Sequence, residues 1–204
     1  MADHSPTDPL TVPATGRWPA DGIAGAGIRL RVWRPDDLAA LLELLSDPEM
    51  RRWSPMIEPP SEADCVARIG KAMQAETDGR PNAFAIVDEA DPSRVLGSMD
   101  WRKDHPMVEF SIVDVGYGVA ATARGRGVAS AALRLLGDWL LDPAGGDVHR
   151  VQLDHAVENE GSCRTALRAG FAIEGRRDVF LPLRETAQSP LVRHDVCLHG
   201  QVRR

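Results

Sequence analysis

The sequence predicts a single α/β domain in which helices flank one central, mixed and mostly antiparallel sheet. Three observations lead to this expectation. Segments with strand-like alternation and segments with a helical apolar period follow one another in the order β-α-α-β-β-β-α-β-α-β-β. Three of the strands are separated only by short turns, which is typical of antiparallel neighbours. The 204 residues are enough for one domain with a substantial core.

The two ends of the chain differ from its middle in composition. Residues 1–27 are rich in Pro, Gly, Asp, Thr and Ala and show no apolar period, so we expect a flexible N-terminal leader. A domain over residues 28–199 and a short C-terminal tail over residues 200–204 complete the predicted organisation.

The elements of the domain begin with a strand. Residues 28–33 alternate apolar and polar side chains, as a half-buried strand does. A helix opens at Pro35 and carries leucines on one face until Pro48 stops it. A second helix begins at the capping box Ser61-x-x-Asp64 and ends before Gly79. The later elements are three strands, a helix, a strand, a shorter helix and two final strands, predicted over residues 83–88, 95–101, 108–119, 127–141, 148–157, 159–170, 171–180 and 191–198.

Composition and charge argue against several classes of function. The 24 basic and 30 acidic residues give a net charge of -6, whereas a protein that binds nucleic acid through its phosphates usually has the opposite bias. No apolar run approaches the roughly 20 residues that span a bilayer, and the N-terminus lacks the pattern of a signal peptide. We therefore expect a cytoplasmic protein whose partners include neither nucleic acid nor membrane.

The cysteines and histidines show no metal-ligand spacing. Cys65, Cys163 and Cys197 are far apart and form no Cys-x-x-Cys pair, so we predict no metal site and a reducing compartment. Cys163 is interpreted as a core residue of its helix. His194 and His199 lie on the last predicted strand, and we expect both at the surface.

The segment most informative about function joins a strand to a helix. Val113–Val119 runs into a short loop, after which Arg124-Gly125-Arg126-Gly127-Val128-Ala129 begins a helix. Backbone N–H groups at a helix start have no intrahelical partner, and the helix dipole adds partial positive charge there. Glycines let a ligand approach the backbone closely, and arginines add cationic donors. Together these features predict a pyrophosphate site.

The same segment resembles the signature of the GNAT acyltransferase superfamily, Gln/Arg-x-x-Gly-x-Gly/Ala. Arg124, Gly127 and Ala129 occupy its positions. The stretch over residues 159–175 is similar to the Asn-x-x-Ser … Gly-Phe-x-x-Glu-Gly pattern, which is frequent in the branch that acetylates ribosomal-protein N-termini and various small amines. The resemblance covers about residues 28 to 199 and places both motifs in the expected order.

This resemblance implies a GNAT-like acyl-CoA N-acyltransferase fold and an acetyl-CoA-dependent N-acetyltransferase. Acetyl-CoA is the implied co-substrate, and a primary amine, on a protein N-terminus or a small molecule, is the acceptor. The oligomeric state, monomer or homodimer, is left open. The backbone N–H groups implied to hold the CoA pyrophosphate are those of Arg124, Gly125, Arg126, Gly127, Val128 and Ala129. The backbone from Tyr117 to Val119 is implied to pair with the pantetheine arm, with Asn159 and Ser162 along its other side.

Acyl transfer to an amine needs a base for the amine, a donor for the oxyanion and a proton for the leaving thiolate. Asp114 is the first candidate base, because it lies on the strand before the pyrophosphate loop, where family members often place a carboxylate; Glu109 and His155 are alternatives. Many superfamily members use a tyrosine after the asparagine-bearing helix as the acid. The only tyrosine here, Tyr117, lies upstream, so Ser162 is the candidate acid, directly or through water.

Two questions stay open from the sequence. The loop over residues 47–59 is the predicted acceptor side, where Arg51, Arg52 and Trp53 either bind an acidic or planar acceptor or form a packed loop with a solvated basic pair. Because a fold does not by itself establish activity, a non-catalytic acyl-CoA sensor or interaction module is the alternative to an enzyme.

Overall fold

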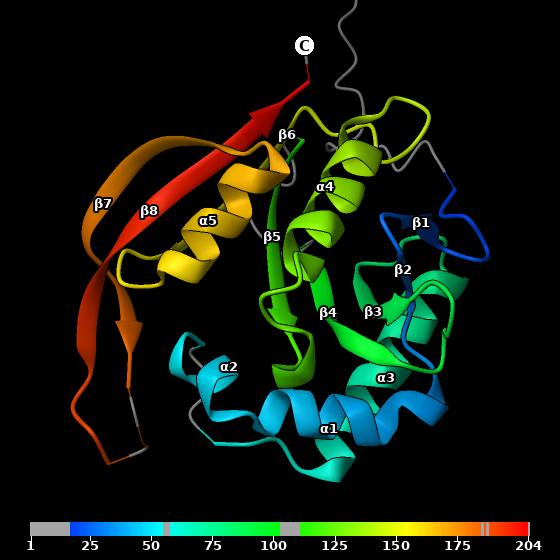
Figure 1. Ribbon diagram of the computed structural model, residues 1–204, viewed down its shortest axis with the longest axis horizontal. Helices are drawn as coiled ribbons and strands as arrows, with labels where there is room; N and C mark the ends of the chain where they lie inside the picture. Colours follow the sequence, from blue (N-terminus) through cyan, green and yellow to red (C-terminus); the bar gives the residue numbers. More distant parts are fainter. Residues whose placement is uncertain (1–16, 55–57, 103–110, 185, 187, 204) are drawn as a thin grey trace, which may run out of the picture.

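One eight-stranded sheet, in the order β1-β2-β3-β4-β5-β6-β8-β7, runs through the chain (Figure 1). The computed structural model describes residues 17–54, 58–102, 111–184, 186 and 188–203. The strands are β1 (Ile23–Gly25), β2 (Ile28–Val32), β3 (Ala83–Asp88), β4 (Val95–Arg102), β5 (Ile112–Val119), β6 (Arg150–Ala156), β7 (Ala172–Leu183) and β8 (Val192–Val202). The helices are η1 (Pro35–Asp37), α1 (Leu38–Ser46), α2 (Pro48–Arg52), α3 (Glu62–Thr77), η3 (Ala121–Ala123), α4 (Val128–Leu141) and α5 (Glu160–Ala169).

The sheet is mixed and mostly antiparallel, which confirms the predicted fold class. All neighbouring strands are antiparallel except β5 and β6. Those two strands share three parallel rungs, the last of which pairs Asp114 with Gln152. Beyond that rung β5 and β6 are no longer paired, and this divergence positions the site described below.

The core lies where α4 packs across the sheet. Its buried face carries Val128, Ala132, Leu133, Leu136 and Leu140, and the helix contacts β1, β2, β4, β5 and β6. Figure 1 shows α4 and α5 side by side in front of the sheet, with α1 and α2 near the end of the sheet where β5 terminates. Among the described residues, none of the helices combines the length and apolar character that crossing a bilayer requires.

Local signals in the sequence determine the ends of two helices. The Ser61 side chain accepts from the Asp64 N–H at 3.2 Å and the Asp64 carboxylate accepts from the Ser61 N–H at 2.9 Å, so the predicted capping box is present. In α5, the Asn159 side chain accepts from the Ser162 N–H at 3.0 Å. Gly170 ends α5 with a φ of 95°, which glycine adopts without a steric penalty.

The ordered fold extends beyond both ends of the predicted domain. Trp18 is buried, stacking on Phe84 with 4.3 Å between ring centroids and meeting Trp139 edge-on at 4.9 Å. Residues 23–25 add strand β1, although residues 1–27 were expected to form a leader. A single tryptophan in a Pro- and Gly-rich stretch has no period, so only its tertiary partners reveal its role. At the other end, β8 continues through Val202.

The predicted loop after α1 contains a short helix. The Asp47 side chain accepts from the Met50 N–H at 3.0 Å and so caps α2. After α2, the described residues of this loop, Trp53, Ser54, Glu58 and Pro59, belong to no helix or strand. Residues 55–57 lie outside the described residues. The strand expected over residues 108–119 is described from Ile112 onward as β5.

Candidate active site

A cleft of about 620 Å³ opens where β5 and β6 diverge. One wall comes from Val115–Val119 of β5 and the other from Leu153–Ala156 of β6, while the starts of α4 and α5 close one side. Residues that stand opposite one another in a ladder share a face of the sheet. By that rule Asp100 and Gly116 belong to one face and Tyr117 to the other, so the cleft is lined from both faces.

The start of α4 has the geometry of an anion cradle. Gly125 and Gly127 have φ values of 74° and 80°, which side chains of L-residues rarely adopt. A Cβ atom at either position would meet nothing within 4 Å, so there is room above the backbone. Val128, Ala129 and Ser130 of the first helical turn line the cleft. Backbone N–H groups of a first turn have no intrahelical partner, and the helix dipole favours negative charge there.

The cradle brings together most of the residues predicted to hold the cofactor. Those that line the cleft are Tyr117, Val119, Arg124, Gly125, Gly127, Val128, Ala129, Asn159 and Ser162. Arg126 does not line the cleft and is exposed beside it. Its side chain is directed away from the cleft. The glycine on either side of Arg126 has a positive φ, which turns the backbone at this point.

Arg124 connects the cradle to the loop after α1. Its guanidinium donates to the Asp47 carboxylate at 2.7 Å, across 77 residues of sequence. Burial disfavours the Asp47 carboxylate, but the hydrogen bonds from Arg124 and from the Met50 N–H outweigh that effect and lower its pKa. Asp47 thus caps α2 and anchors Arg124 with the same side chain.

The sequence interpretation missed two arginines of α5 that line the cleft. Arg164 and Arg168 lie on successive turns of α5. Arg164 also pairs with Glu160 at 3.0 Å, an exposed i,i+4 contact. The signal for their position is the four-residue spacing within the helix, which places both on the same face.

Tyr117 and Ser162 form a polar contact across the cleft. Their hydroxyl oxygens are 2.8 Å apart, although the residues are 45 positions apart in sequence. Burial raises the pKa of Tyr117, so its hydroxyl stays protonated near neutral pH. The sequence interpretation passed over Tyr117 as an acid because of its upstream position, whereas the fold brings its phenol to the residue that was expected to donate.

Asp114 lies on the last rung that pairs β5 with β6, where the two strands begin to separate. It is buried, with 8% of its surface exposed, and its carboxylate accepts from the Gln152 side chain at 3.3 Å. The residues lining the cleft begin at Val115 on β5, so Asp114 lies just below the cleft floor. It stands opposite Arg102 of β4, on the same face as Gly116.

Asp100 is a second carboxylate on this face and does line the cleft. Burial raises its pKa, and the charges of Arg102 and Arg68 oppose that rise only in part. The sequence interpretation missed Asp100. The available signal was the alternation of Ser98, Asp100 and Arg102, three polar side chains at a strand period of two, which all line the cleft.

Of the two alternative bases, His155 and Glu109, only His155 belongs to the described residues. His155 lines the cleft, but its ring nitrogens face the Ala156 carbonyl at 2.8 Å and His199 at 3.2 Å. Burial lowers the pKa of His155, and its face of the sheet is the one opposite to Asp100. Glu109 lies outside the described residues.

The expected acceptor loop is partly packed on itself. Trp53 donates through Nε1 to Glu49 at 2.9 Å, and the Arg52 guanidinium lies 4.7 Å from the Trp53 ring centroid. Glu49 and Trp53 both line the cleft. Met50 from the same loop covers Gly118, since a Cβ there would lie 2.0 Å from the Met50 methyl carbon.

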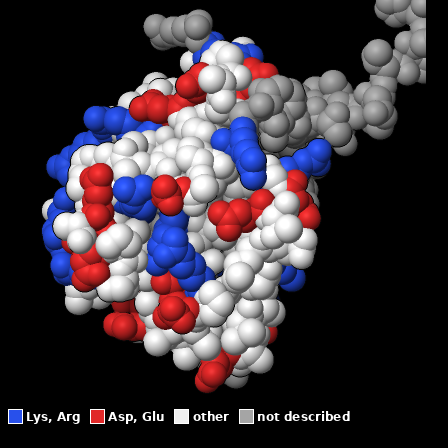
Figure 2. All heavy atoms as spheres, turned by 90° about the vertical axis from the view of Figure 1, so that its right-hand side faces the viewer, with Lys and Arg blue, Asp and Glu red and all other residues white. Residues whose placement is uncertain are grey.

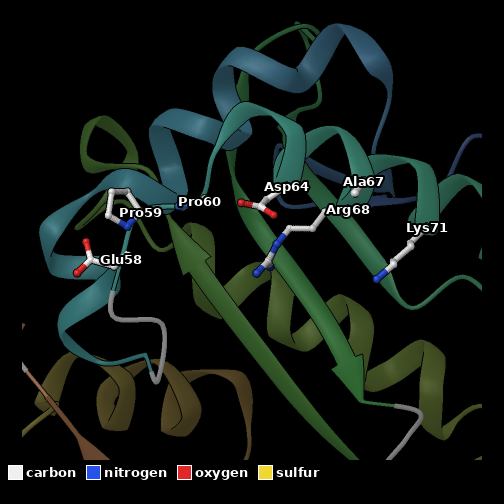
Figure 3. Close-up of a pocket in the computed structure, with 7 residues that line it drawn as sticks. All are labelled: Glu58, Pro59, Pro60, Asp64, Ala67, Arg68 and Lys71. Carbon is white, nitrogen blue, oxygen red and sulfur yellow. The ribbon is translucent and has the colours of Figure 1, made fainter. Parts of the chain in front are cut away.

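A smaller hollow of about 370 Å³ adjoins α3. Figure 3 shows Asp64 and Arg68 projecting from α3 toward the sheet, with Lys71 farther along the helix. Arg68 lines both this hollow and the main cleft. Figure 2 shows the right-hand side of the view in Figure 1, where acidic and basic side chains are interspersed.

Comparisons with known proteins agree with this geometry. Residues 28–172 match the family described as the acetyltransferase (GNAT) domain. Among solved structures, the ribosomal-protein-S5-alanine acetyltransferase from Vibrio fischeri is similar, with a TM-score of 0.71, 16% identity, and coverage of 89% of this chain and 96% of that chain. The microcin C7 self-immunity acetyltransferase MccE, in complex with acetyl-CoA and AMP, has a TM-score of 0.71, 21% identity, and coverage of 91% and 98%.

A third similar structure is the spermidine N-acetyltransferase from Vibrio cholerae in complex with CoA and spermine. Its TM-score is 0.68, with 16% identity, and the match covers 88% of this chain and 97% of that chain. At these identities the structural likeness concerns the fold, and the family match carries the assignment. It covers most of the chain and includes the glycine-rich helix start, so the protein belongs to the GNAT acetyltransferase family.

Proposed function

We propose that this protein transfers the acetyl group of acetyl-CoA directly to a primary amine, on a protein N-terminus or a small molecule. The observation that carries the proposal is the positive-φ glycine cradle of α4, which opens onto the cleft between β5 and β6. If the diphosphate of CoA binds at the cradle, the pantetheine arm extends along that cleft.

The diverging strands suit an extended pantetheine arm. Beyond Asp114, the edge of β5 that faces β6 has no strand partner in the described ranges, and an extended ligand with amide groups pairs with such an edge as an added strand. Tyr117 to Val119 lie along this edge, with Asn159 and Ser162 on the opposite side of the cleft. The acetyl thioester then lies in the gap between β5 and β6, open to both faces of the sheet.

The phosphates of the cofactor are matched by charge as well as by backbone donors. Arg124, Arg164 and Arg168 all line the cleft. Arginine presents a planar set of donors that suits phosphate oxygens. Arg124 must divide its donors between Asp47 and the ligand, so cofactor binding and the position of the α2 loop are coupled in this proposal.

The acceptor amine loses a proton before or as it attacks, because an alkylammonium has a pKa near 10. Two carboxylates share the relevant face of the sheet: Asp114, the candidate from the sequence, and Asp100, which lines the cleft. We favour Asp100 as the base, because its raised pKa makes it a better proton acceptor and it reaches the cleft directly.

After the amine has lost its proton, acetyl transfer proceeds by bond formation, bond breaking and protonation of the leaving thiolate. The amine nitrogen bonds to the thioester carbon, the resulting oxyanion collapses, and the carbon–sulfur bond breaks to release the CoA thiolate. Ser162 gives its proton to that thiolate and takes one from the Tyr117 phenol. Solvent then returns a proton to the Tyr117 phenolate and removes the amine proton held by the base, which restores both groups. Holding the two reactants together lowers the activation free energy by roughly several kcal/mol more.

The test is a turnover screen with acetyl-CoA against peptides and small amines, read by thiol release and by mass spectrometry of the product. We expect a product heavier by one acetyl group, and turnover that Asp100→Asn removes while CoA binding persists. Tight CoA binding without turnover across the panel would instead support the non-catalytic sensor.

A further inference from the structure

Four potential metal ligands from three elements meet between the sheet and α5, the helix that lies between β8 and α4 in Figure 1. They are His155 on β6, Cys163 on α5, and Cys197 and His199 on β8. Their ligand atoms all lie within 4.8 Å of one another. His199 is fully buried, so its expected surface position is wrong: it faces α5 because strand alternation places it with Cys197 on the covered side of β8.

The sheet register explains why these residues converge. His155 stands directly opposite Cys197, and Leu153, two positions earlier, stands opposite His199. Opposite residues share a face and the face repeats every second residue, so the three β ligands project to one side. Cys163 approaches that side from the helix. The sequence spacing that argued against a metal carries no information about this arrangement.

Hydrogen bonds orient both imidazole rings toward the centre of the cluster. His155 donates through Nδ1 to the Ala156 carbonyl at 2.8 Å, and His199 donates through Nδ1 to the Phe171 carbonyl at 3.2 Å. A carbonyl oxygen only accepts, so each Nδ1 carries the hydrogen and each neutral ring presents a lone pair at Nε2. Backbone carbonyls that hold the second ring nitrogen in this way are typical of metal-bound histidine.

The two Nε2 atoms face each other at 3.2 Å, and Cys197 Sγ lies 3.5 Å from His199 Nε2. The Cys197 thiol hydrogen can satisfy one of these lone pairs, which leaves the two nitrogens opposed. A cation between them removes the repulsion. Around a tetrahedral zinc ion, the ligand bond lengths place two nitrogens about 3.3 Å apart and a nitrogen and a sulfur about 3.6 Å apart. The observed spacings approach both values.

We propose that His155, Cys163, Cys197 and His199 bind one Zn²⁺ ion in a closed tetrahedral site. Two thiolates and two imidazoles select a borderline-soft ion over Mg²⁺ or Ca²⁺, which prefer oxygen ligands. Four protein ligands leave no position for water or substrate, so the site is structural. It joins β6, α5 and β8, and it holds the α5 turn that carries Cys163 against the sheet.

The test uses the full chain, without an affinity tag, purified in reductant and free of chelator. Elemental analysis is expected to find about one zinc per chain. Replacement by Co²⁺ is expected to give the visible bands of a tetrahedral ion and a thiolate charge-transfer band in the near ultraviolet. Removal of the metal is expected to lower the Tm by several degrees.

Matched variants locate the ion. Cys163→Ser and Cys197→Ser are each expected to lose the charge-transfer intensity of one thiolate and to bind the metal at least about tenfold more weakly. The controls are His194→Gln, on the same strand but paired with Glu158 at 3.3 Å, and Cys65→Ala, on α3. Both controls are expected to retain the full metal content and the wild-type cobalt spectrum.

Three results would overturn the proposal, and none of them depends on acetyl transfer. Folded, reduced wild-type protein that retains no metal after equilibration with equimolar Zn²⁺ excludes the site. Equal metal content in wild type and in the Cys163→Ser/Cys197→Ser double variant indicates an adventitious ion only. A Cys163–Cys197 disulfide that persists in reductant, with no metal bound, assigns the two thiols to a different role.

Discussion

At the scale of single residues, chemistry depends on which side chains reach the cleft. Asp100 and Asp114 are both acidic residues of the middle strands on one face of the sheet. Only Asp100 lines the cleft, whereas Asp114 is tied to Gln152 beneath it. Their separate contributions are measurable because the two side chains meet different partners.

The first prediction concerns Asp100. A base must be deprotonated, so kcat/KM should fall as the pH drops through the pKa of Asp100, which lies above the ordinary value of 3.8. Asp100→Asn should abolish that acid limb and lower kcat by about 100-fold or more. Arg68→Gln should move the limb to higher pH, because the Arg68 charge opposes the rise in the pKa. An unchanged profile in Asp100→Asn, with loss of the limb in Asp114→Asn, would transfer the role to Asp114.

The second prediction concerns the proton donor. Because burial keeps the Tyr117 phenol protonated, Tyr117→Phe should lower kcat by about 100-fold with little change in the KM for acetyl-CoA. Ser162→Ala should have a similar effect, and the double variant should be no worse than the more impaired single variant if the two hydroxyls act in series. Initial rates over a range of acetyl-CoA concentrations separate kcat from KM. Fully additive losses would indicate two independent roles.

At the scale of elements, the proposed function depends mainly on the starts of two helices. The start of α4 forms the cradle, and the start of α5 supplies Asn159 and Ser162. Both starts are built from local sequence, one by left-handed glycines and the other by an asparagine cap. Substitutions there should alter ligand binding more than the fold.

The third prediction separates these two effects. Gly127→Glu should abolish CoA binding, because its side chain puts a negative charge into the space above the backbone. The positive φ should cost about 1–2 kcal/mol of stability. Gly79→Glu, with a φ of 73° at the end of α3 and open space around it, should cost about as much stability and leave CoA binding intact. Calorimetric titration with CoA and urea unfolding measure the two effects; full CoA affinity in Gly127→Glu would refute the cradle.

A buried ion pair joins β2 to η1 and gives the fourth prediction. Arg31 donates to both oxygens of Asp37 at 2.7 and 2.8 Å, and both residues are almost fully buried. Asp37→Ala should lower the free energy of unfolding by about 3 kcal/mol or more, because it leaves the Arg31 charge buried without that partner. Glu160→Gln, which breaks the exposed pair with Arg164, should cost less than about 1 kcal/mol. Equal effects in chemical denaturation would contradict this difference.

At the scale of the whole molecule, the proposed function places a ligand in the gap where β5 diverges from β6. A cofactor that fills the cleft links the two strands, α4 and α5, and binds only the folded state. The ion pair between Arg124 and Asp47 adds the loop after α1 to this unit. Ligand binding should therefore stabilise the entire fold.

The fifth prediction follows from that linkage. CoA at about 100 times its Kd should add about 2.7 kcal/mol to the free energy of unfolding, and acetyl-CoA should act similarly. Differential scanning calorimetry at rising CoA concentrations should show a Tm that increases continuously with the ligand. Dephosphorylated pantetheine, which lacks the diphosphate, should raise the Tm much less. Equal stabilisation by pantetheine would place the binding energy outside the α4 cradle.

Features that depend on a few neighbouring residues could be predicted from the amino-acid sequence. The capping box at Ser61, the cap at Asn159 and the glycines before α4 act through bonds and φ values within one turn, so their patterns are visible in the chain. Apart from β1 and α2, the order of the main strands and helices followed from alternation and helical period, and with it the fold class. These local preferences do not change when distant segments assemble.

Contacts between side chains that are distant in the sequence could not be predicted in this way, because they form only when the strands and helices assemble. The contact between Tyr117 and Ser162, the position of Asp100 in the cleft and the packing of Trp18 on Phe84 depend on strand register and on the divergence of two strands. His155, Cys163, Cys197 and His199 converge for the same reason. A shift of register by one residue would turn each strand side chain to the other face, and sequence spacing along the chain carries no measure of that register.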